Sequence, residues 1–230
     1  MLFNMKNVRL ENNARSKSRT LMKKVLNISL LFLCLSNAFG QVANLDPKGA
    51  KKVRIESTIY QNSDTTKALS VIYFDGKGNL TKSIKYDAAN APLEEWAYSY
   101  KYSKDRIKTS SSKFKDHTKS LKSQKFKSVF TYSSDNKLQK VVNASYQSGY
   151  ECIYDSVGRL SGRNDYNVKG FYGGAKYFYK DGKIVKQKYE WSNKPPETTE
   201  FIYDSKERRA KALTYRGQKM VRQEVYIYVD

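Results

Sequence analysis

Tyr154-Asp155-Ser156-Val157-Gly158-Arg159-Leu160 decides the fold, because it joins two strand-like runs through a tight turn. Tyr154 ends the first run, and Asp155 can accept backbone N–H groups in an Asx-turn. Gly158 supplies the positive φ that a tight reversal needs, and Leu160 opens the next run. The heptapeptide therefore predicts a β-hairpin in which Asp155 and Gly158 are structural turn residues.

The same order of aromatic residue, polar turn and apolar residue recurs along the chain. From residue 132 the starting aromatics stand at 132, 154, 179 and 203, steps of 22 to 25 residues that suit two strands and their two turns. A further copy follows at Tyr215. Earlier copies begin at Phe74, Tyr86 and Tyr102.

Between the turns the side chains alternate with period two. Trp96, Tyr98 and Tyr100 share one face of a strand, and Phe126 and Phe130 repeat the arrangement. An aromatic content of 13% with only 39% apolar residues suits half-buried sheets. We predict an all-β domain, an antiparallel meander of successive hairpins in an extended or partly coiled sheet.

The unit at Tyr154 to Leu160 resembles the YD-repeat (Rhs-type) family, whose repeat reads Tyr-Asp-x-x-Gly-Arg-Leu. The resemblance implies successive β-hairpins in a sheet that can coil into a shell. It also implies a secreted or surface protein, in a family implicated in carbohydrate binding, adhesion or toxin delivery. The units at Tyr179 and Tyr215 also resemble the strand-Gly-Lys-strand repeats of MORN-like antitoxin proteins, more weakly.

Residues 1–40 read as a signal peptide ahead of a single β-repeat domain at 41–230. Val25 to Leu35 forms an apolar segment that is too short to span a bilayer, and Ala38-Phe39-Gly40 is a small-x-small cleavage site. Met22 before Lys23 and Lys24 suggests that the real start lies there rather than at Met1. We therefore expect a secreted, periplasmic or cell-surface protein without a transmembrane segment after cleavage.

Cysteine usage adds little to this interpretation. Cys34 falls within the apolar segment, where Leu33 occupies the small position of a lipoprotein box, so we expect the thiol to be discarded rather than lipidated. Cys152 is then the single cysteine of the exported form, which excludes an intramolecular disulfide, and its strand-like context suits a buried apolar residue.

The positive charge belongs to the exported domain and gathers in one region. The chain carries 43 Lys+Arg against 22 Asp+Glu, and residues 41–230 keep a net charge of +15. Residues 101–127 alone contribute +8. Within them, the Ser- and Lys-rich stretch 109–125 is predicted to be a solvated, mobile loop inserted in the sheet.

The sequence offers little catalytic equipment. His117 lies in the predicted loop, and the turn aspartates Asp75, Asp87, Asp155 and Asp204 stand where a turn needs an acceptor. There is no phosphate loop, dinucleotide fingerprint, nucleophile elbow or Cys/His metal spacing. We therefore predict no catalytic residue, no metal and no cofactor.

Basic charge with interleaved aromatics predicts a binding protein for a cell-envelope or extracellular polymer such as an anionic polysaccharide. Nucleic acid would use the same residues, but an exported protein meets glycans more often. Lysines could also serve only to protect exposed sheet edges. The alternative functions are a structural or protein-interaction module and, third, a carboxylate-dependent hydrolase. The candidate ligand-binding residues are Trp96 and Trp191 for stacking, and Lys113, Lys115, Lys119, Lys122 and Lys125 for charge.

Overall fold

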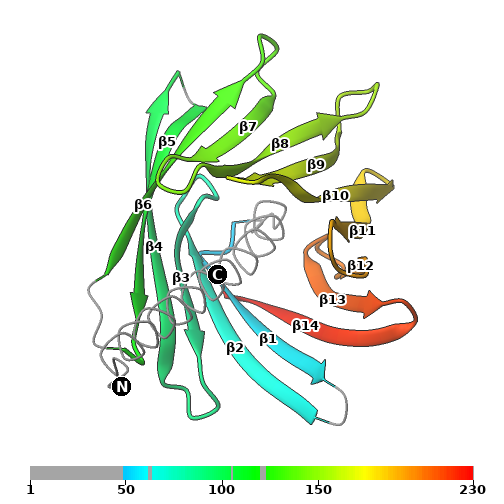
Figure 1. The fold of residues 1–230 in the computed structure, drawn as a ribbon. Helices are drawn as coiled ribbons and strands as arrows, with labels where there is room; N and C mark the ends of the chain where they lie inside the picture. The colour runs from blue at the N-terminus through cyan, green and yellow to red at the C-terminus, as the bar shows by residue number, and fades with distance from the viewer. Residues whose placement is uncertain (1–48, 62–63, 105, 120–122, 230) are drawn as a thin grey trace, which may run out of the picture. The chain divides into compact units, whose positions relative to one another are not determined.

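The computed structural model describes residues 49–61, 64–104, 106–119 and 123–229 (Figure 1). The chain divides into units 1–46 and 47–230, and the strands belong to the second unit. The predicted signal peptide lies outside the described residues. Within these ranges there is no helix of the length and hydropathy that crossing a membrane requires. The strands are β1 Lys52–Gln61, β2 Asp64–Phe74, β3 Leu80–Tyr86, β4 Pro92–Ser103, β5 Arg106–Asp116, β6 Gln124–Tyr132, β7 Leu138–Asn143, β8 Ser148–Tyr154, β9 Leu160–Asn167, β10 Gly170–Lys180, β11 Lys183–Trp191, β12 Glu197–Tyr203, β13 Arg209–Arg216 and β14 Lys219–Val229.

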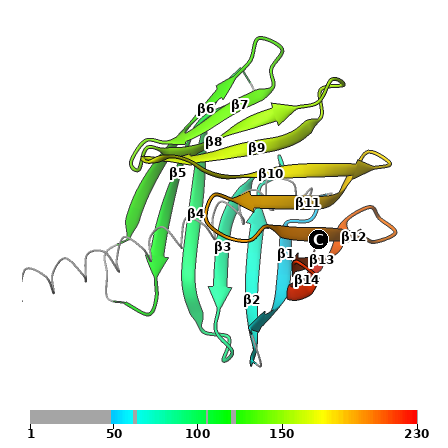
Figure 2. The same ribbon diagram turned by 45° about the vertical axis from the view of Figure 1, so that its right-hand side comes forward.

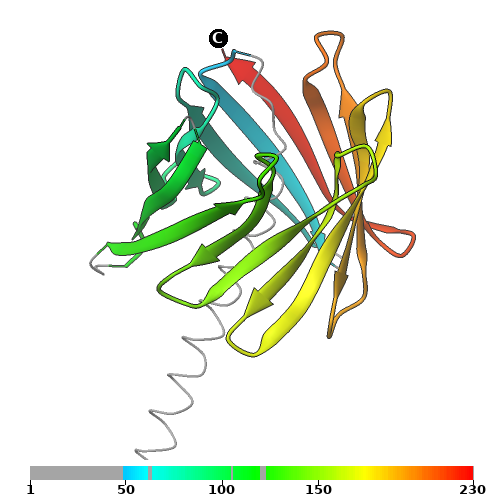
Figure 3. The same cartoon turned by 90° about the horizontal axis from the view of Figure 1, so that it is seen from above.

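The strands form one antiparallel meander, which confirms the predicted all-β class. Each strand pairs with its neighbours in sequence, as the run from β8 to β12 shows in Figure 2. The sheet is neither extended nor partly coiled, contrary to the expectation from the sequence, because β1 also pairs with β14 and the sheet closes into a barrel (Figure 3). The seam runs from Lys52 opposite Val229 to Ile59 opposite Arg222. Closure pairs the N–H and C=O groups that two open edges would expose.

A register shift accompanies each repeat aromatic at one end of the barrel. The shifts fall immediately before Phe74, Tyr102, Tyr132, Tyr154, Tyr179 and Tyr203. A β-bulge bends its strand and increases its twist, and bulges are common at barrel rims. The repeat therefore marks where each second strand curves, and we call this end of the barrel the repeat-turn end.

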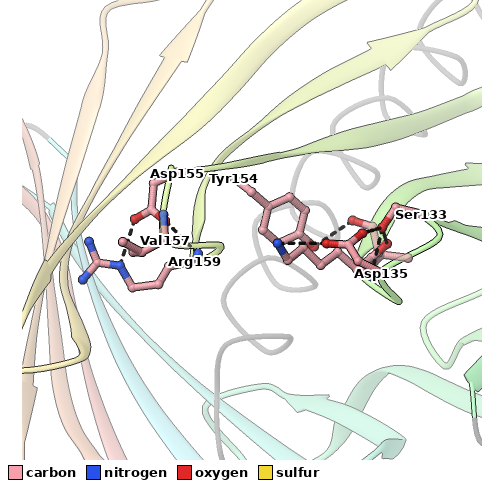
Figure 4. Close-up of polar contacts among 8 residues, drawn as sticks. Ser133, Asp135, Tyr154, Asp155, Val157 and Arg159 are labelled. Carbon is pink, nitrogen blue, oxygen red and sulfur yellow. Dashed lines mark hydrogen bonds and ion pairs between the residues drawn. The ribbon is translucent and has the colours of Figure 1, made fainter.

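The heptapeptide forms the predicted turn (Figure 4). Asp155 Oδ1 accepts backbone N–H groups from Val157 at 3.1 Å and Arg159 at 2.8 Å, while Oδ2 accepts the Arg159 Nε–H at 2.8 Å. Gly158 has a φ of 81°. Both residues occupy the positions in the turn that the sequence predicts for them. Asp75, Asp87 and Asp204 accept backbone N–H groups in the same way within their own turns.

Each turn also holds the aromatic residue of the next repeat. Arg159 lies over the Tyr179 ring at 4.9 Å, and the Tyr179 hydroxyl donates to the Leu160 carbonyl at 2.8 Å. The ring contact gives the Arg of the repeat a physical role, whereas the hydrogen bond uses only the backbone of residue 160. The equivalent cation and ring pairs are Lys77 with Tyr102, Arg106 with Tyr132, Lys137 with Tyr154, Lys183 with Tyr203 and Arg208 with Tyr228.

Two of the sequence units do not belong to this series. Tyr86 and Tyr215 precede hairpins at the opposite end of the barrel, where β3 turns into β4 and β13 into β14. Tyr228 continues the series instead, because its hydroxyl donates to the Arg209 carbonyl at 3.0 Å. At the repeat-turn end, therefore, each tyrosine of the series contacts the turn that precedes it in the sequence.

The prediction of a basic Ser/Lys loop at 109–125 was wrong. Residues 109–116 belong to β5 and residues 124–125 to β6, so a hairpin replaces most of the loop. Ser110 and Phe114 are buried on one face of β5, whereas Lys113 and Lys115 are exposed on the other. Small serines in place of apolar residues disguised the period-two pattern of a strand.

The turn geometry predicts that Gly158 is more sensitive than its carboxylate neighbour. Gly158→Val should destabilise the barrel by about 1 to 3 kcal/mol, because a β-branched residue is strained at positive φ. Asp155→Asn keeps a turn acceptor and should cost less. Thermal unfolding of the two variants measures the order, and a greater loss in Asp155→Asn would show that the charge of the carboxylate, not the turn, matters.

Candidate functional site

The two faces of the barrel wall differ in chemistry at β4 to β6. In a closed barrel, alternate side chains face the interior and the outside. Trp96, Phe114 and Phe126 are buried together on the inner face, with ring centroids 4.7 and 5.4 Å from that of Trp96. Lys113 and Lys125 alternate with these aromatics and are exposed. The outer face therefore presents charge where the inner face is aromatic.

Four exposed lysines form a diagonal row on the outer face of β5 and β6, which we call the lysine row. Lys115 and Lys113 succeed each other on β5, and Lys125 and Lys127 on β6. Lys113 lies directly opposite Lys125, and Lys127 lies opposite Ser111. Because the strands are antiparallel, the row extends over four residue steps, about 13 Å at roughly 3.3 Å per residue in a twisted strand.

The lysine row forms no ion pair with a described residue, although Glu95 of β4 lies opposite Lys115 and pairs with Lys82 and His117 instead. Other lysines on the wall form ion pairs, such as Lys82 with Glu95 at 3.0 Å and Lys140 with Glu151 at 2.7 Å. Like charges directly opposite on neighbouring strands repel. A bound anion would therefore reduce the repulsion between the lysines of the row.

A hollow of about 510 Å³ lies over the same three strands. Residues of β4, β5 and β6 form most of its lining, and Ser145 of the β7–β8 turn completes it. The lining contains three lysines of the row and four serines but no carboxylate. A ligand there would meet positive charge and hydroxyl groups together. The lining residues are Ala97, Tyr98, Ser99, Ser111, Ser112, Lys113, Lys125, Phe126, Lys127 and Ser145.

The structure brings together only part of the predicted site. Lys113, Lys115 and Lys125 lie in the row, while Lys119 lies in the β5–β6 turn and pairs with Asp116 at 2.9 Å. Lys122 lies outside the described residues.

The two tryptophans are not part of the lysine row. Trp96 is 7% exposed on the opposite face of the wall, so the expectation that it stacks on a sugar at the surface was wrong. Trp191 ends β11, on a different part of the wall, where its ring is 4.2 Å from that of Tyr189.

Sequence reasoning missed Lys127 and the serines beside it. The alternation typical of a strand is visible at Lys125, Phe126 and Lys127, but residues 109–125 were predicted to form a loop. Extending the alternation back across Lys113-Phe114-Lys115 would have placed four lysines on one face. The signal was therefore present in the sequence but was masked by the serines.

A second polar cluster lies on the inner face between β8 and β12. Arg163 Nε is 3.1 Å from Asp165 Oδ1, and the two side chains are 4% and 1% exposed. Tyr189 donates its hydroxyl to Asp165 Oδ2. Gln187 is also buried, and its Oε1 has no hydrogen-bond partner. The cluster links β9 and β11 in the interior of the barrel.

The remaining reactive groups have structural partners. Burial raises the pKa of the Cys152 thiol to about 11, which suits the predicted packing role. His117 Nε2 lies 3.3 Å from Glu95 Oε2, and the Lys82 side chain is the main cause that lowers the pKa of Glu95. No group of three or more His, Cys, Asp or Glu residues within the described ranges is arranged to hold a metal ion.

Comparisons with known proteins give similarities of fold only. No protein-family model matches the chain, so none supports the YD-repeat resemblance, and no curated protein matches it. A solved porin-like protein from Bacteroides uniformis has 11% identity and a TM-score of 0.47 over 80% of this chain and 98% of its own. A Tc holotoxin pore from Photorhabdus luminescens has 11% identity and a TM-score of 0.33 over 74% of this chain and 14% of its own. Similarities this low do not indicate a shared function.

Proposed function

We propose that the chain is an exported, non-catalytic binding protein whose lysine row binds an anionic polymer of the cell envelope or extracellular space. The observation that carries this proposal is the row itself, in which four exposed lysines that form no ion pair with any described residue lie side by side on β5 and β6. Export rests on the signal peptide predicted from the sequence.

The alternative that these lysines only protect the protein from aggregation is weakened for β5 and stays open for β6. Lysines discourage pairing when they lie on exposed sheet edges. β5 is paired with β4 on one side and with β6 on the other, so Lys113 lies away from a free edge. β6 pairs with β7 only from Ser128 to Tyr132, so Lys125 has β5 alone beside it. A bound anion would offset the repulsion between the opposed Lys113 and Lys125.

The linear form of the row favours a polymer over a small anion. Charges spread over about 13 Å along the strand direction can contact several successive anionic groups of an extended chain. Ser99 and Ser111 beside the row supply hydroxyl groups that can donate hydrogen bonds to a sugar or to its acidic substituents. The turn aspartates, in contrast, are occupied by their own backbones, which supports a non-catalytic function.

The proposal predicts that affinity for a polyanion depends on where the lysines lie and not on the net charge of the protein. Lys113→Gln, Lys125→Gln and Lys127→Gln together should weaken binding to heparin, a linear polyanion used as the probe. They should also make the slope of log Kd against log salt shallower by about two, because fewer counterions are released. Fluorescence anisotropy across a salt series measures both effects.

The matched control removes the same charge from lysines that are already paired. Lys82, Lys140 and Lys188 contact Glu95, Glu151 and Glu190, and their replacement by Gln should leave the slope near that of the wild type. Circular dichroism verifies that both variants are folded. Equal losses in the two triple variants would show that binding follows net charge alone and would contradict the proposal.

A further inference from the structure

Two of three neighbouring hairpins present exposed large apolar side chains at the end of the barrel opposite the repeat turns. Successive hairpins of a meander alternate between the two ends, so the β7–β8, β9–β10 and β11–β12 turns share this end. Val168 and Phe171 flank the tip of the β9–β10 hairpin and are 70% and 56% exposed. Tyr146 in the β7–β8 turn is 36% exposed. We call these three turns the tip surface.

The geometry of the tip surface suits contact with a broad, flat partner. Neighbouring hairpins are two strands apart, so three tips extend over about 19 Å at 4.8 Å per strand. Phe171 is held by an edge contact with Tyr166, with ring centroids 6.0 Å apart. Gly170 adopts a φ of 101° and makes the hairpin tight, which fixes Val168 and Phe171 on either side of it.

The charges of the tip surface add a second, independent indication. Lys169 is exposed at the tip of its hairpin, and Lys194 lies over the Trp191 ring at 5.4 Å. The residues that join these strands, 144–147, 168–169 and 192–196, include no Asp or Glu. The repeat-turn end differs, because its turns carry Asp75, Asp155 and Asp204, whereas the Asx-turn of Asp87 lies in the β3–β4 turn at the same end as the tip surface. Aromatic, aliphatic and lysine side chains together are typical of protein surfaces that lie in a membrane interface.

We propose that the tip surface rests on an anionic lipid bilayer, with Val168 and Phe171 entering the headgroup region. An anionic bilayer offers both an apolar layer for these side chains and negative charge for Lys169 and Lys194. The lysine row lies on the wall of β5 and β6 and adjoins the tip surface at the β7–β8 turn, where Ser145 lines the hollow. Contact through the tip surface places the barrel as a peripheral protein held at a membrane surface by one end.

The test compares two valines of equal exposure at opposite ends of the barrel. Val157 in the repeat turn is 72% exposed, against 70% for Val168. In the full chain with Cys34→Ser, an environment-sensitive fluorophore is attached to Val168→Cys or to Val157→Cys. Cys152, a free and partly buried thiol, is replaced by Ser in both proteins, so that the label attaches only to the introduced cysteine. Vesicles of phosphatidylcholine with added phosphatidylglycerol should shift the emission of the label at 168 to the blue and leave that at 157 unchanged.

A second measurement gives the affinity that the tips contribute. Val168→Asp with Phe171→Ser should weaken binding to the phosphatidylglycerol vesicles at least about tenfold, because two apolar side chains no longer leave water. Val157→Asp with Phe178→Ser should not, although Phe178 is 44% exposed on the barrel wall. Affinity for heparin should be the same in both variants, which separates this proposal from polymer binding.

Three results would overturn the inference. One is an equal response of the labels at 157 and 168, and another is no response from either. The third is vesicle binding that is lost in the variant of Lys113, Lys125 and Lys127 but kept in the variant of Val168 and Phe171. That outcome would assign lipid binding to the lysine row and leave the tips as ordinary turns.

Discussion

Asp165→Asn should destabilise the barrel by about 3 to 5 kcal/mol, the largest loss that we expect from a change of a single charge. Asp165 is 1% exposed, and its Oδ1 lies 3.1 Å from Nε of Arg163, which is 4% exposed. The amide keeps an acceptor for the Tyr189 hydroxyl but removes the negative charge that faces a buried guanidinium. Urea unfolding followed by circular dichroism measures the difference.

Two controls separate burial from charge in this experiment. Glu56 pairs with Arg54 at the same two-residue spacing and at 2.9 Å, but both side chains are about half exposed. Glu56→Gln should therefore cost no more than about 1 kcal/mol. Arg163→Met with Asp165→Leu removes both charges and should cost less than Asp165→Asn alone. A double variant less stable than the single one would mean that the pair itself stabilises the barrel.

Gly149→Ala and Gly162→Ala should each cost about 3 kcal/mol, although each adds only a methyl group. A Cβ at Gly162 would lie 2.6 Å from the Ala175 carbonyl oxygen of the next strand, and one at Gly149 would overlap the Val141 carbonyl oxygen. Both obstacles are backbone, so the strands would have to separate. Differential scanning calorimetry measures the effect as a lowered Tm.

Gly76 supplies the matched control for these glycines. A Cβ there would meet nothing within 4 Å, and the residue is not among the glycines with positive φ. Gly76→Ala should change stability by no more than about 0.5 kcal/mol. If all three variants unfold alike, the close approach of strands at Gly149 and Gly162 does not shape the wall as we describe.

The sequence was sufficient to predict the strands and the repeat turn, because both depend on short-range chemistry. Asp155 and Gly158 act within five residues of each other, and their roles followed from turn geometry alone. Closure of the barrel was not predictable in this way, because it depends on Lys52 meeting Val229 across the whole chain. The positions of the bulges that curve the wall could not be predicted either, because a bulge is defined by the register of two paired strands.

The candidate site was predicted in composition but not in arrangement. The excess of positive charge near residues 101–127 was correct, and three of the five predicted lysines lie in the row. Lys113 lies opposite Lys125 because of the register of β5 against β6. Residues 109–125 were predicted to form a loop, and a loop has no strand register from which this position could be derived. Trp96 was misassigned because an aromatic in a strand has two possible faces, and only burial distinguishes them.

The most direct test of the central claim is a map of lysine reactivity in the folded protein with and without heparin. Each accessible amine is acylated at low extent, and mass spectrometry of the digest reports the change at every site. The lysine row predicts that Lys113, Lys115, Lys125 and Lys127 lose reactivity together on binding, while Lys180 and Lys206 at the repeat-turn end keep theirs. Protection spread evenly over the barrel, or centred away from β5 and β6, would contradict it.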